Sequence, residues 1–186
     1  MAKKLIGSAA LTTDTSGLAT SVMTTKGDLA TYSTSRVRIG IGNNSDIFVA
    51  DSGEATGNKW TANTTSFVLA CSDEETALTT GTKLIFRMPF AYTVTAVRAS
   101  LTTAGTGANL VTVDIHEGTG GGTTILDPVI TIDADETTST TAATPPVVDD
   151  PDLADDAQMT IDVDQLDSGG VAAGLKVYII GYRVAH

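Results

Sequence analysis

The feature that most limits the fold is a succession of strand-like segments from Thr65 onward, separated by turn-forming clusters at roughly 8–12-residue intervals. Within these segments apolar and polar residues alternate, as on a strand with one buried face. The clearest alternation places Met159, Ile161 and Val163 on one face and carboxylates on the other. The pattern therefore predicts an all-β domain. The expected strands are 66–71, 83–88, 92–101, 110–116, 124–133, 159–164 and 175–184.

Composition also favours sheet over helix. Threonine is abundant and β-branched, and only 18% of the residues are charged. An eighth strand is expected at 137–143, at a sheet edge, because Pro145 and Pro146 end it and open an acidic loop at 149–156. Seven or eight strands in about 120 residues predict a two-sheet sandwich with a jelly-roll-like topology.

Two local expectations complete this reading of the sandwich. In the third expected strand, the alternation places Val94 and Arg98 on one face and Val97 on the other. Helical turns are expected only at 152–158 and 73–78.

Residues 1–62 have a different pattern. Short apolar pieces are separated there by Thr, Ser, Gly and Asn, and no helical spacing is present. A long segment without a core of its own is either disordered or laid against a partner, and the repeated apolar pieces favour the partner. The sequence thus predicts an extended N-terminal anchoring arm over 1–62 and a β-sandwich domain over 63–186.

The charge is unevenly distributed. The net charge is -11 and the pI is about 4.3, yet residues 1–98 hold nine Lys or Arg and eight Asp or Glu. Residues 99–175 hold fourteen Asp or Glu and no Lys or Arg. Such a chain repels a phosphate backbone, which argues against a nucleic-acid partner. No apolar run approaches the roughly 18 residues of a membrane span, and no membrane partner is expected. This asymmetry has two interpretations: the acidic residues form a solvated surface, or residues 1–98 bind a partner while the acidic region 99–175 faces solvent.

The sequence offers little for catalysis. His116 and His186 are the only histidines, and His116 is interpreted as a strand residue on the face of Asp114 rather than as part of a triad. The glycine-rich stretch 118–122 lacks a phosphate-loop ending and is interpreted as a hairpin loop. A single cysteine, Cys71, forms no intrachain disulfide. We therefore expect no enzyme, no cofactor and no metal site, with loose calcium binding by the acidic loop left open.

Two stretches near the N-terminus resemble a known family. They are TTKGDL at 24–29 and ADSGEATGNKW at 50–60, which are similar to a segment of tailed-bacteriophage virion proteins, including tail fibres, head fibres and capsid decoration proteins. This copy departs from the family at Val49, where Leu or Thr is usual, and at Asn58, where Leu is frequent. A looser likeness to phage structural sandwiches lies in DAQMTIDVD at 156–164 and AAGLKVYIIG at 172–181.

The resemblance implies a non-enzymatic virion protein, commonly a homotrimer anchored by its N-terminal part. Three copies would bury the apolar pieces of the arm against one another. The leading hypothesis is a capsid-surface decoration protein or head fibre that is made in the bacterial cytoplasm and binds the major capsid protein. Partner contacts are expected from basic and apolar residues of the arm: Lys3, Lys4, Lys26, Arg36, Arg38, Ile39, Ile41 and Trp60.

Two alternatives stay open. A short tail-fibre or adaptor subunit would share the family but occupy another place on the virion. A carbohydrate-binding jelly-roll module that attaches to a host surface glycan would share the fold; sugar sites usually need exposed aromatic rings, and aromatic residues make up only 5% of this chain.

Overall fold

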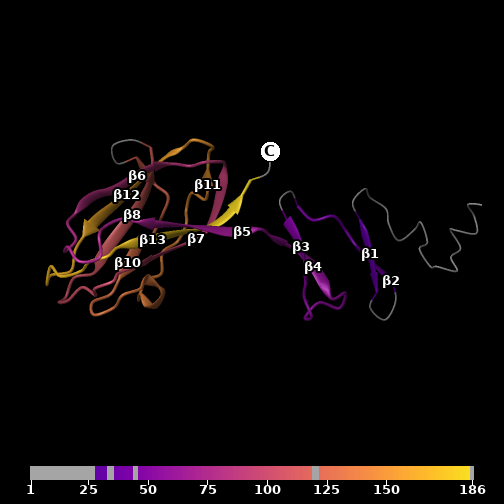
Figure 1. Cartoon of the computed structure of the whole chain (residues 1–186), viewed down its shortest axis with the longest axis horizontal. Coiled ribbons are helices and arrows are strands. Elements are labelled where there is room, and N and C mark those ends of the chain that lie inside the picture. The colour runs from indigo at the N-terminus through magenta and orange to yellow at the C-terminus, as the bar shows by residue number, and fades with distance from the viewer. Residues whose placement is uncertain (1–27, 33–35, 44–45, 119–121, 185–186) are drawn as a thin grey trace, which may run out of the picture. The chain divides into compact units, whose positions relative to one another are not determined.

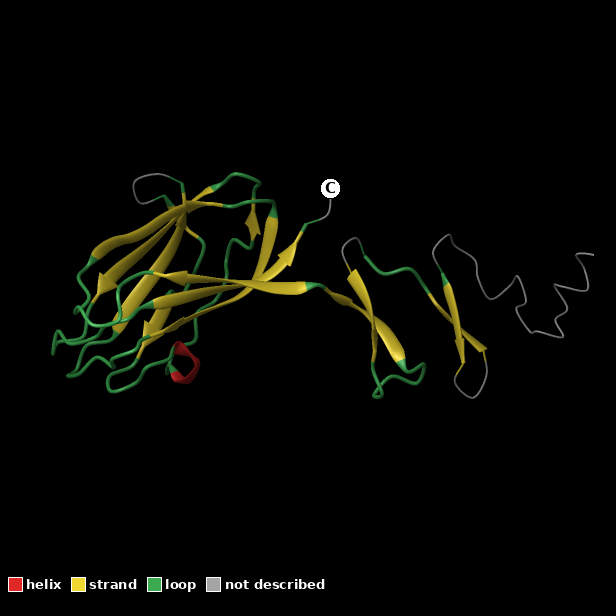
Figure 2. Ribbon diagram, viewed as in Figure 1, coloured by secondary structure: helices red, strands yellow, loops and turns green. Residues whose placement is uncertain are grey.

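The computed structural model describes residues 28–32, 36–43, 46–118 and 122–184. The chain divides into two units, Met1–Asn63 and Thr64–His186, and all their strands except β9 are labelled in Figure 1. Strands dominate the described residues, and the one helical element among them is the single 3₁₀ turn η1 (Ser139–Thr141), drawn red in Figure 2. The protein is all-β.

The described part of the first unit consists of two separate hairpins. The strands β1 (Leu29–Tyr32) and β2 (Arg36–Ile39) form one antiparallel pair. The strands β3 (Asp46–Ala50) and β4 (Asn58–Ala62) form the other. Two-stranded sheets are marginally stable by themselves in water, so each hairpin depends on what packs against it.

The second unit is a β-sandwich of two antiparallel sheets. The first sheet has the order β10-β8-β12-β6, with β9 paired to β8, and the second has the order β11-β7-β13-β5. The strands are β5 (Thr64–Ala70), β6 (Gly81–Arg87), β7 (Tyr92–Ser100), β8 (Val111–Glu117), β9 (Thr123–Thr124), β10 (Ile130–Ile132), β11 (Asp152–Leu153), β12 (Gln158–Gln165) and β13 (Lys176–Arg183).

The strand order is that of a jelly roll. If β9 is set aside and the other strands of the sandwich are counted in chain order from β5, the second sheet reads 1-8-3-6 and the first reads 2-7-4-5. Successive strands thus pass between the sheets, except that β8 and β10 are neighbours in the first sheet, and the last two strands, β12 and β13, lie in the interior of the two sheets. This arrangement of two interleaved Greek keys defines the jelly-roll sandwich.

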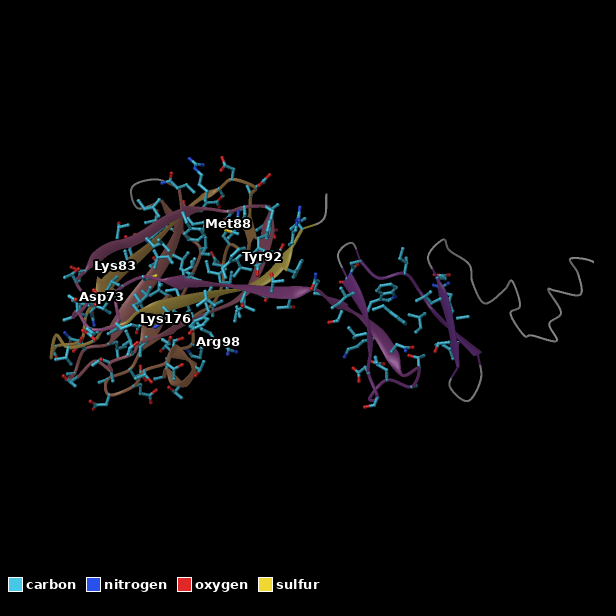
Figure 3. All side chains as sticks on the ribbon, viewed as in Figure 1. Asp73, Lys83, Met88, Tyr92, Arg98 and Lys176 are labelled. Atoms are coloured by element: carbon cyan, nitrogen blue, oxygen red, sulfur yellow. The ribbon has the colours of Figure 1, made fainter. Side chains whose placement is uncertain are left out.

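The core lies between the two sheets. Alternation along β12 buries Met159, Ile161 and Val163, each at most 1% exposed, as the sequence predicts. Met88 and Tyr92 are also buried, and both are labelled in Figure 3. All large buried apolar side chains of the described residues belong to this sandwich.

The structure corrects four expected elements. The segment 137–143 is not an edge strand: it contains η1, because the Thr138 side chain accepts a hydrogen bond from the Thr140 amide and so competes with strand pairing. The edge strand is instead β11, within the segments expected to be an acidic loop and a helical turn. The other expected helical turn, 73–78, contains no helix. The expected strand 124–133 is divided into β9 and β10, because Pro128 has no N–H for the ladder.

The expected faces of β7 are also corrected. Val94 and Val97 are both buried, at 2% and 5% exposure, although the alternation predicted opposite faces. The register with β13 shifts between Ile180 and Gly181, which marks a bulge near Thr95. Because the bulge adds one residue, the side chains after it alternate in the opposite sense. Val97 therefore points into the core, and Arg98 lies on the exposed face.

Candidate functional site

The hairpin unit is held together by one aromatic cluster around Trp60. The Trp60 ring lies opposite Phe48 across the β3–β4 pair, with ring centroids 4.9 Å apart. Its Nε1 donates to the Gly40 carbonyl at 2.7 Å, which ties the residues after β2 to β4. The backbone of Gly42 passes so close to the ring that a Cβ there would lie 2.7 Å from Trp60 Cγ. Glycine is therefore required at position 42 for this contact.

Two ion pairs stabilise the hairpins. Arg38 Nε lies 3.4 Å from Asp28 Oδ2, and the Asp28 side chain is almost fully buried. Lys59 Nζ lies 2.5 Å from Asp51 Oδ2 beside the β3–β4 turn. The hydrogen bond from Lys59 is the largest cause that lowers the pKa of Asp51, and the Gly53 amide contributes to the same shift. The two pairs fix the ends of the hairpins rather than form a reactive site.

The described hairpins expose large apolar side chains and bury none. Ile41 is 61% exposed, and Leu29, Ile47 and Phe48 are each about two-fifths exposed. Among the described residues of this unit only Asp28, a charged residue, is classed as buried. Exposed large apolar side chains mark a candidate interaction surface. We call the four exposed residues Leu29, Ile41, Ile47 and Phe48 the hairpin apolar set.

The residues expected to contact partners fall into three groups. Arg38, Ile39, Ile41 and Trp60 lie in or beside the hairpins, with Ile41 exposed, Ile39 and Trp60 half-buried and Arg38 paired to Asp28. Arg36 begins β2. Lys3, Lys4 and Lys26 lie outside the described residues. Their role in anchoring stays a prediction.

Sequence reasoning did not single out Asp28 and Phe48. Asp28 belongs to the TTKGDL stretch, so the motif itself was the available signal. Phe48 could be found only from the β3–β4 register, which pairs it with Trp60.

His116 lies between two carboxylates on the outer face of the first sheet. Its Nε2 is 3.4 Å from Asp114 Oδ2 and 3.4 Å from Asp162 Oδ2, and its Nδ1 is 3.1 Å from the Gly122 carbonyl. Asp114 and Asp162 face each other directly across β8 and β12, and His116 Nε2 lies within 3.4 Å of both carboxylates. The described residues place no serine or cysteine in hydrogen-bonding contact with His116. The cluster therefore reads as a polar contact that bridges β8 and β12.

Neither a metal cluster nor a membrane-spanning helix is found in the described part of the chain. No three His, Cys, Asp or Glu side chains there are grouped to hold a metal ion. No helix in that part is both long and apolar enough to cross a bilayer. The expected absence of metals, cofactors and catalysis stays a prediction.

Comparison with known proteins identifies no relative. No protein-family model matches the chain, and neither the curated proteins nor the solved structures contain a match. The function is therefore proposed from the sequence motifs, the fold and the exposed side chains of the hairpins.

Proposed function

We propose that this protein is a non-enzymatic structural component of a tailed-bacteriophage virion, a homotrimer seated on the capsid surface as a decoration protein or head fibre. Its N-terminal part anchors it to the major capsid protein, and its acidic jelly roll faces outward. The proposal combines the family resemblance of TTKGDL and ADSGEATGNKW with the properties of the two units.

The observation that carries the proposal is the contrast in burial between the units. The sandwich has a complete apolar core, whereas the described hairpins bury no apolar side chain and expose the hairpin apolar set. Covering such side chains contributes roughly 1.5–3 kcal/mol for each large residue. A unit of this kind gains its stability from neighbouring copies or from the particle on which it sits.

Charge supports the same orientation. The sandwich from residue 64 onward carries seventeen Asp or Glu and five Lys or Arg, whereas residues 1–63 carry five and six. The nearly neutral front meets another protein surface without strong repulsion, and the acidic sandwich keeps neighbouring particles apart.

The test uses virions. Cryo-electron microscopy of purified particles, before and after the protein is stripped, should place its density on the head. Density on the tail alone would contradict the decoration role and favour the tail-fibre alternative. Absence of the protein from purified particles would contradict the virion role altogether.

A second experiment tests the anchor. A chain lacking residues 1–60 should keep the melting temperature of the sandwich but fail to rebind stripped capsids. The matched control is the full chain, which should rebind. Rebinding by the shortened chain would show that the sandwich, not the N-terminal part, carries the attachment site.

A further inference from the structure

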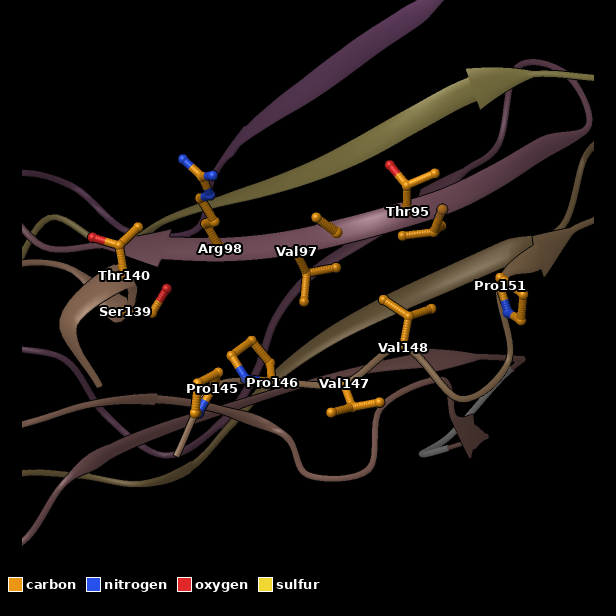
Figure 4. Close-up of a pocket in the computed structure, with 12 residues that line it drawn as sticks. Thr95, Val97, Arg98, Ser139, Thr140, Pro145, Pro146, Val147, Val148 and Pro151 are labelled. Carbon is orange, nitrogen blue, oxygen red and sulfur yellow. The ribbon is translucent and has the colours of Figure 1, made fainter. Parts of the chain in front are cut away.

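A groove of about 530 Å³ runs along one edge of β7 in the second sheet (Figure 4). Residues 94–98 of β7 form one wall, and residues 145–148 form the other. The turn η1 closes one end through Ser139 and Thr140, and Pro151 lines the other end. The groove exists because β11, the strand that pairs with this edge, is only two residues long.

The edge of β7 that faces the groove lacks a partner strand. β11 pairs only with Tyr92 and Thr93. The Val94 amide donates to the Pro151 carbonyl at 2.8 Å, and the Ala99 amide donates to Ser139 Oγ at 2.8 Å. Between these two positions no described strand pairs with this side of β7. Val97 precedes Ala99 by two residues, so its amide and carbonyl point to the same side and face the groove.

The opposite wall supplies apolar surface, and the Val147 backbone in it is engaged away from the groove. The Val147 amide donates to the Pro128 carbonyl at 3.0 Å, and the Val147 carbonyl accepts from the Asp127 amide at 2.9 Å. Both groups are therefore engaged behind the wall. Pro145 and Pro146 have no amide hydrogen at all. One wall thus offers a free strand edge and the other offers aliphatic contacts, which together suit an extended peptide.

Arg98 adds a charge to this edge. Its side chain lies on the opposite side of β7 from Val97 (Figure 4). Among the described residues, it is the one cation of the sandwich with no ion pair, side-chain hydrogen bond or ring partner. The other four are engaged: Lys83 with Thr79, Arg87 with Asp156, Lys176 with Glu74 and Arg183 with the Phe90 ring. An unengaged guanidinium in a strongly acidic domain is complementary to a carboxylate of the occupant.

We propose that the groove binds an extended segment of another protein as an added strand, antiparallel to β7, with an acidic side chain beside Arg98. The antiparallel direction follows from β11, which continues the same edge antiparallel to β7. In this register one peptide residue exchanges both backbone hydrogen bonds with Val97 and points its side chain toward Pro146 and Val148. The residue before it lies opposite Arg98. This site is independent of the anchoring surface in the proposed function.

A sugar acid is the competing occupant. Arg98 also borders a smaller hollow of about 240 Å³, whose lining includes the hydroxyl groups of Ser66, Ser100, Thr140 and Tyr178. A carboxylated sugar would engage Arg98 and these hydroxyls, but it would leave the Val97 backbone without a partner. The free strand edge therefore favours the peptide.

The experiment uses the full chain and a fluorophore-labelled, acetylated pentapeptide, Thr-Glu-Val-Thr-Val, in fluorescence polarisation at low salt. We expect saturable binding, and about tenfold weaker binding when the glutamate is replaced by lysine. Methylation of the central valine nitrogen should abolish binding, because that nitrogen donates to the Val97 carbonyl. Arg98→Glu should reverse the preference and favour the lysine peptide.

Lys83→Glu is the matched control, since it makes the same change of charge on the sandwich away from the groove, and it should leave the preference unchanged. The proposal is wrong if the glutamate peptide shows no saturable binding up to millimolar concentration. It is also wrong if the methylated peptide binds equally well, or if Arg98→Glu does not reverse the preference. Binding of methyl glucuronide without binding of the peptide would assign the site to a sugar instead.

Discussion

Burial governs the chemistry of Cys71, whose side chain is 6% exposed in the sandwich core. Burial raises the pKa of its thiol to about 11, although a backbone hydrogen bond with Val177 acts in the opposite direction. The thiolate is the reactive form. At pH 8 we therefore expect the native protein to react with Ellman's reagent roughly a hundredfold more slowly than the urea-unfolded chain. Equal rates would mean that Cys71 is accessible in the native state.

Asp167 is a buried carboxylate that organises the loop between β12 and β13. Burial by itself raises the pKa of this group, but backbone amides outweigh the effect, and its pKa lies below the usual range. The Thr106 amide donates to Oδ2 at 3.0 Å, the Val171 amide at 3.2 Å, and the Ala172 amide donates to Oδ1 at 3.4 Å. A lowered folded-state pKa adds stability above the unfolded-state value, about 3.9, which is lost as the pH falls through the folded-state value.

Asp167→Asn should consequently destabilise the protein by about 1.5–3 kcal/mol at pH 7, measured by urea unfolding. The difference from wild type should shrink as the pH falls below about 4, because the unfolded wild-type chain is then protonated at this carboxyl, and it should be lost once the pH also passes the lower pKa of the folded state. The control is Asp164→Asn. Burial, and then repulsion from Asp114 and Asp162, raise the pKa of Asp164, partly offset by His116, so removing its charge should not destabilise the protein at pH 7. If the free energy of unfolding lost in Asp167→Asn did not depend on pH, packing of the side chain rather than its charge would stabilise this loop.

At the scale of elements, β12 is the strand on which the sandwich most depends. It pairs with β8 on one side and β6 on the other, and it contributes three buried side chains to the core. Ile161, at its centre, is fully buried. Ile161→Asp should cost about 4 kcal/mol or more, because it places an unpaired charge in the core, and thermal melting should show a largely unfolded sandwich.

Ile85→Asp is the control for this substitution. Ile85 lies in the neighbouring strand β6, but its side chain is 57% exposed on the outside of the same sheet. The variant should melt close to wild type. A well-folded Ile161→Asp protein would contradict the orientation assigned to β12.

The long strands were predictable from two kinds of pattern. β12 alternates apolar and polar residues along its length, whereas β13 is a nearly continuous apolar run, as expected of a strand in the interior of a sheet. β11 was not predictable, because its two residues carry no periodic signal and lie in an acidic segment. η1 was missed because it depends on the short-range contact between Thr138 and the Thr140 amide. The predicted faces of β7 were wrong after Thr95, because the strand has a bulge there. The position of the bulge depends on the pairing of β7 with β13, and the sequence of β7 alone does not encode that pairing.

The same distinction applies to the candidate site. Trp60 was conspicuous as the one tryptophan of the chain. Its contacts with Phe48, Gly40 and Gly42 depend on how two hairpins meet, which residue types alone do not specify. The β7 groove could not be predicted from the sequence either, because it exists only where the neighbouring strand β11 ends after two residues.

At the scale of the whole molecule, the two units differ in how far they bury their own apolar side chains. The jelly roll encloses a core of about two dozen apolar residues between its sheets. The hairpins are too small to enclose one and leave the hairpin apolar set at the surface. Marginal two-stranded sheets of this kind become stable when association covers them. If the proposed trimer forms, we therefore expect oligomerisation to be the property most sensitive to substitutions in the hairpins.

Ile41→Asp tests this dependence, because Ile41 is the most exposed member of the hairpin apolar set at 61%. In sedimentation velocity at micromolar concentration, the wild-type chain should behave as a trimer. The variant should dissociate toward monomer, with association weakened at least about tenfold, since burying this side chain is worth roughly 1.5–3 kcal/mol and the charge adds a desolvation cost. The melting temperature of the sandwich should be unchanged. Val68→Asp, at an equally exposed position on β5, should remain trimeric. A trimer that tolerates Ile41→Asp, or a wild-type chain that is monomeric at these concentrations, would mean that the hairpins do not obtain their missing interior from other copies.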